Sequence, residues 1–386
     1  MKAFDVLLLL VRSSMFDEPL SSEIKETITD ERLKKLYKLS SKHDIAHLVA
    51  HALEQNGLLG DSEIGRAFIG ERDKAVLRYR LLRRELDDLS RVLDENGIPY
   101  IPLKGSVIRK YYPEPWMRTS CDVDVLVKHE DLDTAKAALE SNLGYAFKGV
   151  YTDHDISLFA PSGMHIELHY DLLDDDRKGE EIISRVWQYS NLDDGAASRY
   201  SMCPEFFYFY HVVHMANHFR HGGCGARTLL DLYMLNHHYE AIDRAHLDEM
   251  LSCAGFSEFE AAVRELSEVW FGKAEMNDLL CDVEEFILTG GVYGTRANRI
   301  SVSQVKSGGR FKYLLSRIFI SNSALKKKYP VLEERPYLIP LYHVRRWLKP
   351  IFNRKTKENS MNEISHTSNA EKNENKTAAL LSRLNI

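Results

Sequence analysis

The sequence lacks the features that mark membrane-spanning and secreted proteins. No uninterrupted apolar run approaches the roughly 18 residues that a membrane-spanning helix requires. The N-terminus has no basic region ahead of its apolar run, so no export signal is predicted. The five cysteines have no paired spacing, which argues against a disulfide framework. These absences predict a cytoplasmic protein with reduced thiols.

The chain also lacks a strong excess of either charge. Its net charge is -6 over 386 residues, and without a broadly basic surface, long duplex nucleic acid is not the expected partner. Hydrophobic residues make up 44% and charged residues 28% of the chain. This composition is that of a globular protein and excludes a disordered or fibrous one. At this length, two or three domains with proper cores are expected.

The most informative pattern that is present is an acidic strand, Cys121–Val127. Its three valines are β-branched and alternate with Asp122, Asp124 and a leucine, so a strand would direct both aspartates to one face. Two carboxylates this close repel each other unless a cation lies between them. A hard ion such as Mg²⁺ takes oxygen ligands and needs only one or two further protein donors. The pattern therefore predicts a metal pair with a third carboxylate nearby.

A glycine turn precedes this strand. The apolar stretch Ile98–Leu103 reads as a strand that leads into Lys104, Gly105 and Ser106. Backbone N–H groups in turns of this kind form concave sites for anions. The turn is therefore a predicted phosphate-binding site, placed just ahead of the metal pair.

A hairpin follows the acidic strand. Residues 155–160 read as one strand, Pro161–Gly163 as the turn, and residues 164–171 as a second strand in which apolar and polar residues alternate. Glu167 lies in the middle of the second strand, at one of its polar positions. It is the expected third carboxylate.

With these residues the sequence resembles the nucleotidyltransferases of the DNA polymerase β superfamily. The mark of that superfamily is an apolar residue, Gly-Ser or Gly-Gly, then Asp-x-Asp and a later carboxylate. The variant Leu-Lys-Gly, Tyr-x-x-Pro, Arg and Asp-x-Asp is similar to a bacterial branch of largely uncharacterised nucleotidyltransferase-like proteins. The likeness is strong over residues 95–175 and loose over the helical remainder. Sixteen residues separate Gly105 from Asp122, which is more than is usual in the superfamily.

The resemblance implies a fold, an activity and a set of site residues. The fold is α+β, with a small mixed β-sheet core of the polymerase β type flanked by N-terminal and C-terminal helical regions. The activity is transfer of a nucleoside monophosphate from a nucleoside triphosphate such as ATP to a hydroxyl-bearing acceptor, with Mg²⁺ (or Mn²⁺) and release of pyrophosphate. Polysaccharide or natural-product biosynthesis is a fitting setting. The catalytic and metal-binding residues would be Asp122, Asp124 and Glu167, and the nucleotide-binding residues Lys104, Gly105, Ser106 and Arg118.

Helical periodicity and composition divide the chain into four regions. Residues 1–95 form a predicted N-terminal helical region, 96–175 the nucleotidyltransferase core, and 176–350 a C-terminal helical region. Residues 351–386 are rich in Asn, Ser, Glu and Lys and are expected to be a disordered tail. In the first region three histidines share a helical face that offers no other metal ligands, so a solvated or packing face is expected. They are His43, His47 and His51.

A second stripe of histidines lies on the predicted helices of residues 205–238. Its members are His211, His214, His218 and His221, and Arg227 and Asp231 follow them. In one hypothesis His214, His218 and Arg227 face a cleft and contact substrate or phosphate. In another the stripe is a packing seam, with Arg227 and Asp231 as an i, i+4 ion pair. A zinc site is the third, but no further ligand is evident.

Positive charge is concentrated in residues 324–357. This segment has ten Lys or Arg against two Glu, with aromatic and aliphatic residues between them. It could contact an anionic membrane surface peripherally, or form short helices with solvated basic faces. Its four prolines argue against a single amphipathic helix.

Two rival functions stay open beside transfer. One is a non-catalytic nucleotide-binding or scaffold protein with the same fold. The other is a metal-dependent phosphohydrolase that uses His214 and His218 with a distant aspartate such as Asp231. Zinc retained through purification would favour the hydrolase, and loosely held Mg²⁺ the transferase. The acceptor, which is a small molecule, a sugar or a protein, leaves no decisive signature in the sequence.

Overall fold

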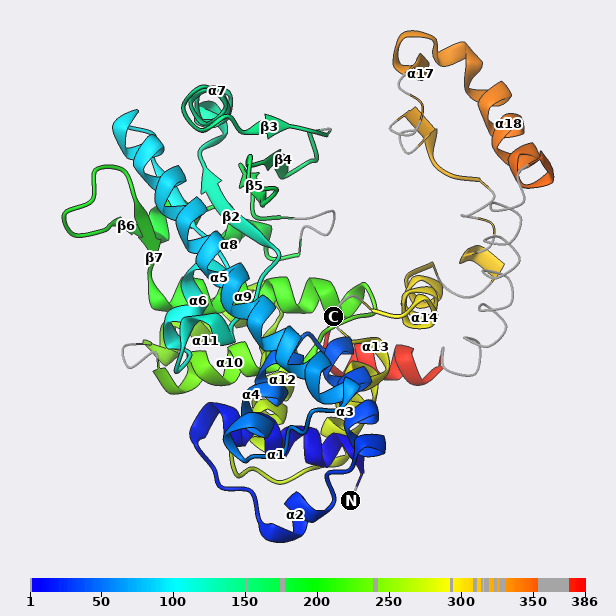
Figure 1. The fold of residues 1–386 in the computed structure, drawn as a ribbon. Helices are drawn as coiled ribbons and strands as arrows, with labels where there is room; N and C mark the ends of the chain where they lie inside the picture. The colour runs from blue at the N-terminus through cyan, green and yellow to red at the C-terminus, as the bar shows by residue number, and fades with distance from the viewer. Residues whose placement is uncertain are drawn as a thin grey trace. The chain divides into compact units, whose positions relative to one another are not determined.

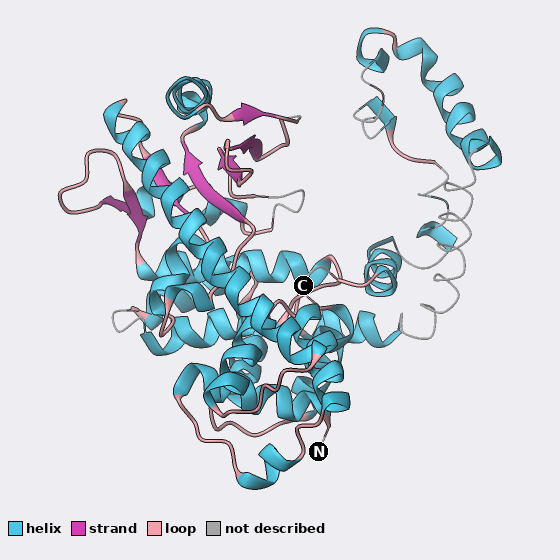
Figure 2. Cartoon of the chain, in the orientation of Figure 1, coloured by secondary structure: helices cyan, strands magenta, loops and turns pink. Residues whose placement is uncertain are grey.

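The computed structural model forms two compact units, shown as ribbons in Figures 1 and 2. The first comprises Met1–Asn217 and Gly225–Glu284, and the second His218–Cys224 and Glu285–Ile386. None of the helices among the described residues is both long and apolar enough to cross a membrane. The structure describes residues 2–149, 151–173, 178–238, 242–291, 294–307, 311–313, 315, 319–322, 325–326, 329, 331–352 and 375–386.

The first unit contains a mixed five-stranded sheet, coloured magenta in Figure 2. The strand order is β1-β2-β5-β4-β3, with β2 and β5 parallel and the other pairs antiparallel. The strands are β1 (Tyr100–Pro102), β2 (Asp122–Val127), β3 (Ala146–Phe147), β4 (Asp155–Phe159) and β5 (His165–His169). The predicted acidic strand, the hairpin and the α+β fold with a small mixed sheet are thereby confirmed.

Two helices, α5 (Glu63–Glu95) and α7 (Leu132–Leu143), bury one face of this sheet. Side chains alternate between the faces of a strand, so the valines of β2 lie in the core and its aspartates lie on the opposite face. Each aliphatic side chain buried there contributes about 1.5–3 kcal/mol to folding. The core residues include Leu82, Leu89, Val92, Val123, Val125, Val127, Leu139, Ile156, Leu158, Ile166 and Leu168.

The long helix α5 begins and ends where the sequence provides caps. The Ser62 hydroxyl accepts the Gly65 N–H at 3.3 Å at its start. At its end Gly97 has a φ of 64°, a conformation that glycine adopts without strain, and its N–H donates to the Asp94 carbonyl. The Asn96-Gly97 pair therefore directs the chain from the helix into β1.

Four shorter helices precede α5 and supply the packing role expected of their histidines. His43 is fully buried, and its Nδ1 accepts the Ala226 N–H at 3.3 Å. Nε2 of His47 lies 2.7 Å from the Met117 carbonyl oxygen. The ring of His51 meets the Trp116 ring edge-on. The four helices are α1 (Ala3–Phe16), α2 (Ser22–Glu26), α3 (Asp30–Lys42) and α4 (Ala46–Gln55).

His43 should make the stability of the protein sensitive to acid. Burial, followed by the charge of Lys42, lowers the pKa of His43 to about 4, against about 6.5 in an unfolded chain. Between these pH values the unfolded chain binds the proton and the native one does not, so stability falls as pH falls from 6.5 to 4. His43→Asn retains an acceptor near Nδ1 and should remove roughly 3 kcal/mol of this loss. Urea unfolding at several pH values measures it, and an unchanged pH slope in the variant would contradict it.

Helices fill most of the rest of the first unit. The two helices predicted within residues 205–238 are confirmed as α9 (Pro204–Arg220) and α10 (Ala226–His238). A two-stranded sheet, β6 (Ser190–Leu192) with β7 (Tyr200–Met202), interrupts a region that was expected to be helical, because strands of three residues show no periodicity. The other elements are α6 (Gly105–Ile108), η1 (Arg109–Tyr111), η2 (Pro115–Met117), η3 (His129–Asp131), α8 (Glu180–Ile183), η4 (Val186–Tyr189), α11 (Arg244–Ala254), α12 (Ser257–Phe271) and α13 (Asp278–Gly290).

The second unit contains most of the basic segment and the C-terminus. The helices of its described residues include α14 (Arg296–Ser307), α17 (Val331–Glu334), η5 (Pro336–Leu338) and α18 (Ile339–Phe352). The described part of the basic segment is not one helix, as its prolines predicted: Pro336 begins η5, whereas Pro340 and Pro350 lie within α18.

The expected disordered tail requires a correction at its end. Residues 375–383 are helical, and Leu380, Leu381 and Leu384 are buried. These leucines lie at helical spacing in an otherwise polar stretch, so composition concealed a short apolar stripe. Residues 353–374 of the predicted tail, with part of the 324–357 segment, lie outside the described residues.

Candidate active site

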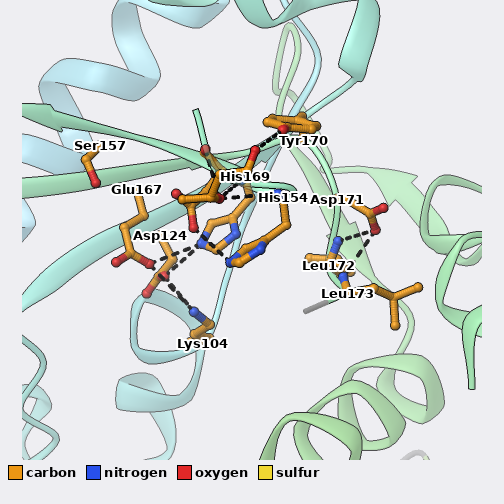
Figure 3. Close-up of polar contacts among 12 residues, drawn as sticks. Lys104, Asp124, His154, Ser157, Glu167, His169, Tyr170, Asp171, Leu172 and Leu173 are labelled. Carbon is orange, nitrogen blue, oxygen red and sulfur yellow. Dashed lines mark hydrogen bonds and ion pairs between the residues drawn. The ribbon is translucent and has the colours of Figure 1, made fainter. Parts of the chain in front are cut away.

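The face of the sheet that the core helices leave open carries a grid of polar side chains. Asp122 lies opposite His165, and Asp124 opposite Glu167, across the parallel β2–β5 pair. On the other side of β5, Ser157 lies opposite Glu167. Since alternate residues of a strand share a face, the Asp-x-Asp pattern of β2 meets the Glu167 side chain directly. Figure 3 shows Asp124 and Glu167 pointing toward each other.

Asp124 is the most tightly held carboxylate of the three. It is 3% exposed, and its Oδ1 accepts hydrogen bonds from Lys104 Nζ at 2.8 Å and His169 Nε2 at 3.0 Å. Burial favours the protonated form, but the charges and hydrogen bonds of Lys104 and His169 outweigh it and hold the pKa of Asp124 well below its usual value. This side chain is therefore ionised at neutral pH.

Asp122 is in the opposite electrostatic situation. Burial, with the negative charges of Asp124 and Glu167, raises the pKa of Asp122 to about 6. Negative charge is thus in excess on this face even with Lys104 present. A divalent cation would relieve the excess, and the donor set of carboxylate oxygens suits such an ion.

Glu167 connects the other polar groups. Its Oε2 lies 3.4 Å from His169 Nε2 and 3.9 Å from Lys104 Nζ, and its Oε1 lies 3.8 Å from His165 Nδ1. Sequence reasoning named Glu167 but gave no role to the two histidines. The signal was present, because both flank Glu167 at two residues' distance on one strand and so must share its face.

Three groups of described side chains bring at least three ligand atoms within 4.8 Å of one another. Asp122 and Asp124 belong to different groups, and Glu167 belongs to both of those groups. The groups are Asp122, His165 and Glu167; Asp124, Glu167 and His169; and His154, Asp155 and His169.

The predicted glycine turn lies beside this face. Ser106 N–H donates to the Leu103 carbonyl at 3.0 Å, which closes a four-residue turn, so the Gly105 amide and the Ser106 hydroxyl are left as the predicted phosphate donors. Gly105 is closely packed, because a Cβ there would lie 3.2 Å from Arg118 Nη1 and 3.3 Å from Arg109 Nη2, so the arginines would have to shift by a few tenths of an ångström. Both arginines thus support the turn from behind.

Lys104 has an unusual backbone conformation within this turn. Its φ of 44° and ψ of -118° lie in a region that glycine occupies readily and L-residues rarely do. Burial opposes its positive charge, but Asp124, Tyr210 and Glu167 together raise the pKa of Lys104. Tyr210, a buried residue of α9, was not foreseen as part of this environment.

The strain at Lys104 can be measured with two matched substitutions. Lys104→Gly and Lys104→Ala both remove the ammonium group and differ only in the Cβ atom. The glycine variant should be the more stable by about 1 kcal/mol, because only the alanine variant retains a Cβ at positive φ. Denaturant unfolding of the pair measures this difference. Equal stabilities would show that the turn relaxes freely.

Arg118 lies in a buried ion pair behind the turn and away from the carboxylate face. Its Nε lies 2.8 Å from Asp231 Oδ1 and its Nη2 2.8 Å from Asp231 Oδ2, and the Tyr112 hydroxyl donates to the same carboxylate at 2.7 Å. The side chains of Arg118 and Asp231 are almost fully buried. Two nitrogens of the Arg118 guanidinium already contact the Asp231 carboxylate, and the guanidinium supports the turn. The nucleotide contact that the resemblance implied for Arg118 stays a prediction.

The hypotheses for the histidine stripe are also changed. Arg227 pairs with Asp44 and donates to the Thr119 carbonyl at 3.3 Å, so the expected Arg227–Asp231 pair was wrong, because Arg118 reaches Asp231 from another part of the chain. His214 is half-buried and His218 is exposed. No metal-ligand group found within the described ranges includes either histidine. The contacts of His214, His218 and Arg227 to substrate or phosphate stay a prediction.

Comparison with known proteins matches the chain to one family description. A family model described as an uncharacterised nucleotidyltransferase matches residues 29–272. No curated protein and no solved structure matches the chain. The matched residues run from just before α3 to the end of α12 and include the whole carboxylate face and the glycine turn.

Proposed function

The chain belongs to this uncharacterised nucleotidyltransferase family, and from that membership we propose that it transfers a nucleoside monophosphate from a nucleoside triphosphate to a hydroxyl-bearing acceptor. Pyrophosphate is the second product. The observation that carries the proposal is the placement of Asp122, Asp124 and Glu167 on one open sheet face beside the Lys104–Ser106 turn. Such a face offers metal ligands and phosphate donors next to each other.

In the reaction one phosphorus–oxygen bond forms and another breaks. The acceptor hydroxyl oxygen attacks the α-phosphorus, the bond from the α-phosphorus to the bridging oxygen breaks, and pyrophosphate leaves with that electron pair. The hydroxyl proton passes to a carboxylate of the site. Mg²⁺ (or Mn²⁺) bound to Asp122, Asp124 and Glu167 would neutralise phosphate charge and lower the pKa of the attacking hydroxyl.

The residues of the turn bind the phosphates in this proposal. The Gly105 amide and the Ser106 hydroxyl would donate hydrogen bonds to the β- and γ-phosphates. Lys104 supplies a buried positive charge that the phosphates need as negative charge moves onto pyrophosphate. Arg109 fixes the turn through the Gly105 carbonyl, to which its Nε donates at 2.6 Å.

The rival functions have less support. The phosphohydrolase would need Asp231 as a ligand beside His214 and His218, but Asp231 accepts hydrogen bonds from Arg118 and Tyr112. A non-catalytic scaffold would not require three carboxylates and a lysine on one face. The acceptor is a small molecule, a sugar or a protein, and biosynthesis of polysaccharides or natural products is the proposed setting.

The proposal includes a cytoplasmic location with peripheral contact to an anionic membrane through residues 324–357. Support comes from the described part of this segment, where Tyr337, Leu341 and Trp347 are exposed. Arg335 and Arg345 are also exposed there. Aromatic and cationic side chains together suit an interface between water and acidic lipid.

Calorimetric titration of the four ribonucleoside triphosphates tests the proposed function. One triphosphate should bind in the presence of Mg²⁺, and its dissociation constant should rise by about 100-fold or more in an Asp122→Asn, Asp124→Asn double variant, because two of the carboxylates that would hold the ion are lost. An Asp133→Asn variant on the exposed face of α7 is the matched control. If none of the four binds, the scaffold alternative replaces the transferase.

A further inference from the structure

The strand β5 presents a His-x-Glu-x-His pattern to the carboxylate face. His165, Glu167 and His169 are alternate residues of β5 and so project from the same side of the sheet. Across the parallel pair, His165 lies opposite Asp122 and Glu167 opposite Asp124. Imidazole nitrogens therefore lie among the carboxylate oxygens on both sides of Glu167.

We propose that His165 and His169 are metal ligands, so that this face binds its divalent ions through nitrogen as well as oxygen and prefers Mn²⁺ to Mg²⁺. This inference rests on the proposed function, since it concerns the ions of the same site. It departs from a site made of carboxylates alone, which is what the resemblance implied.

The first ligand set is Asp122, His165 and Glu167. One ligand atom from each lies within 4.8 Å of the others. Nε2 of His165 lies 3.0 Å from the Ser157 hydroxyl, and Nδ1 lies 3.8 Å from Glu167 Oε1. In the tautomer that donates Nε2–H to Ser157, Nδ1 carries a free lone pair on the side of the carboxylates. Metal-bound histidines are usually oriented by such a hydrogen bond from the other ring nitrogen.

The second ligand set is Asp124, Glu167 and His169. Nε2 of His169 lies 3.0 Å from Asp124 Oδ1 and 3.4 Å from Glu167 Oε2 (Figure 3). The His154 ring stacks on the His169 ring with centroids 5.9 Å apart, and Asp155 lies opposite His169 in the β4–β5 register. These neighbours hold the buried imidazole in place with Nε2 directed at two carboxylates, and binding of an ion would displace the proton that Nε2 donates to Asp124 in the metal-free chain.

Metal preference follows from the kind of donor atom. Imidazole binds first-row transition ions well, whereas Mg²⁺ favours oxygen ligands and gains little from nitrogen. Mn²⁺ suits carboxylate oxygen as Mg²⁺ does, and as a first-row transition ion it also gains from imidazole nitrogen. A face with two imidazoles among three carboxylates therefore discriminates between the two ions.

A different role for the histidines would leave a different mark. If they only hydrogen-bond to the carboxylates, their loss weakens Mg²⁺ and Mn²⁺ binding equally. If they are ligands, His→Gln exchanges a nitrogen for an amide oxygen, which Mg²⁺ accepts and which costs Mn²⁺ its nitrogen donor. The ratio of the two affinities separates these roles.

The experiment titrates the full, metal-free chain with Mn²⁺ alone and with Mg²⁺ alone, without nucleotide. In pulsed electron paramagnetic resonance, bound Mn²⁺ should show coupling to directly bonded nitrogen. In a His165→Gln, His169→Gln double variant, the coupling should disappear and the Mn²⁺ dissociation constant should rise about 100-fold, with Mg²⁺ affinity changed less than about threefold. His129→Gln, which alters an exposed histidine of η3, is the control.

The outcomes separate this inference from the proposed function. Bound Mn²⁺ without nitrogen coupling in the unmodified protein overturns the inference and leaves a carboxylate-only transferase site intact, and this readout needs no variant to fold. Equal losses of both ions in the double variant overturn it as well. Nitrogen coupling that is lost in His154→Gln but kept in the double variant would place the ion elsewhere. If neither ion binds, the inference fails, and the triphosphate titration with Mg²⁺ decides the proposed function separately.

Discussion

Asp124→Asn should reduce nucleotidyl transfer by about a thousandfold or more. Asp124 is the buried, ionised carboxylate on which Lys104 and His169 converge. An amide in its place removes the negative charge that a divalent ion needs, and a bound metal contributes several kcal/mol to a transition state of this kind. The change leaves Lys104 without its ion partner but also removes repulsion between Asp124 and its carboxylate neighbours, so we expect a folded variant of lower stability.

The measurement is pyrophosphate release from whichever triphosphate calorimetry selects, in the presence of a mixture of sugar and protein acceptors. Asp133→Asn makes the same chemical change on an exposed helix position and should leave the rate unaltered. Thermal unfolding checks that both variants are folded. Turnover of the Asp124 variant at the unmodified rate would remove the proposed mechanism.

Arg118→Met should destabilise the protein by about 3–5 kcal/mol, because it leaves Asp231 buried without its ion partner. Arg118 is 7% and Asp231 1% exposed, so water cannot replace the lost contacts. The pair is the main polar connection between the back of the glycine turn and α10, and a buried unpaired charge is among the largest single-residue effects on folding.

A double-mutant cycle separates the pair from its surroundings. Asp231→Asn keeps an oxygen that can accept from Tyr112 and removes the charge. Combined with Arg118→Met, it leaves no buried charge, so the double variant should be more stable than the sum of the single losses predicts, by about 2 kcal/mol or more. Urea unfolding of the four proteins gives this coupling energy. Strictly additive losses would mean that the ion pair contributes little.

The parts of the structure that were predictable from sequence rest on local periodicity. Valines alternating with aspartates fixed both the strand and the side on which the carboxylates lie, and Pro161–Gly163 fixed the hairpin that brings Glu167 to them. The same alternation would have placed His165 and His169 beside Glu167. Their position followed from the sequence, but no role in binding a metal was predicted for them.

The parts that sequence reasoning missed depend on distant contacts. Arg118 and Asp231 are 113 residues apart, and nothing in the local pattern favours that pair over Arg227, which stands one helical turn from Asp231. Tyr210 likewise comes near Lys104 only through packing of α9 in the first unit. Buried polar groups find partners by three-dimensional proximity, so their pairing cannot be read along the chain.

The hydrogen bond from Lys104 Nζ to Asp124 Oδ1 has a practical consequence. A structural zinc domain unfolds when a chelator removes its ion, because the free energy of metal binding is then lost from folding. Here an ammonium group of the chain itself already stands against the most buried carboxylate, so the polypeptide supplies its own counter-ion. We therefore expect folding to depend less on metal supply than in such a domain, so that the protein stays folded in chelating buffer and takes up an ion afterwards.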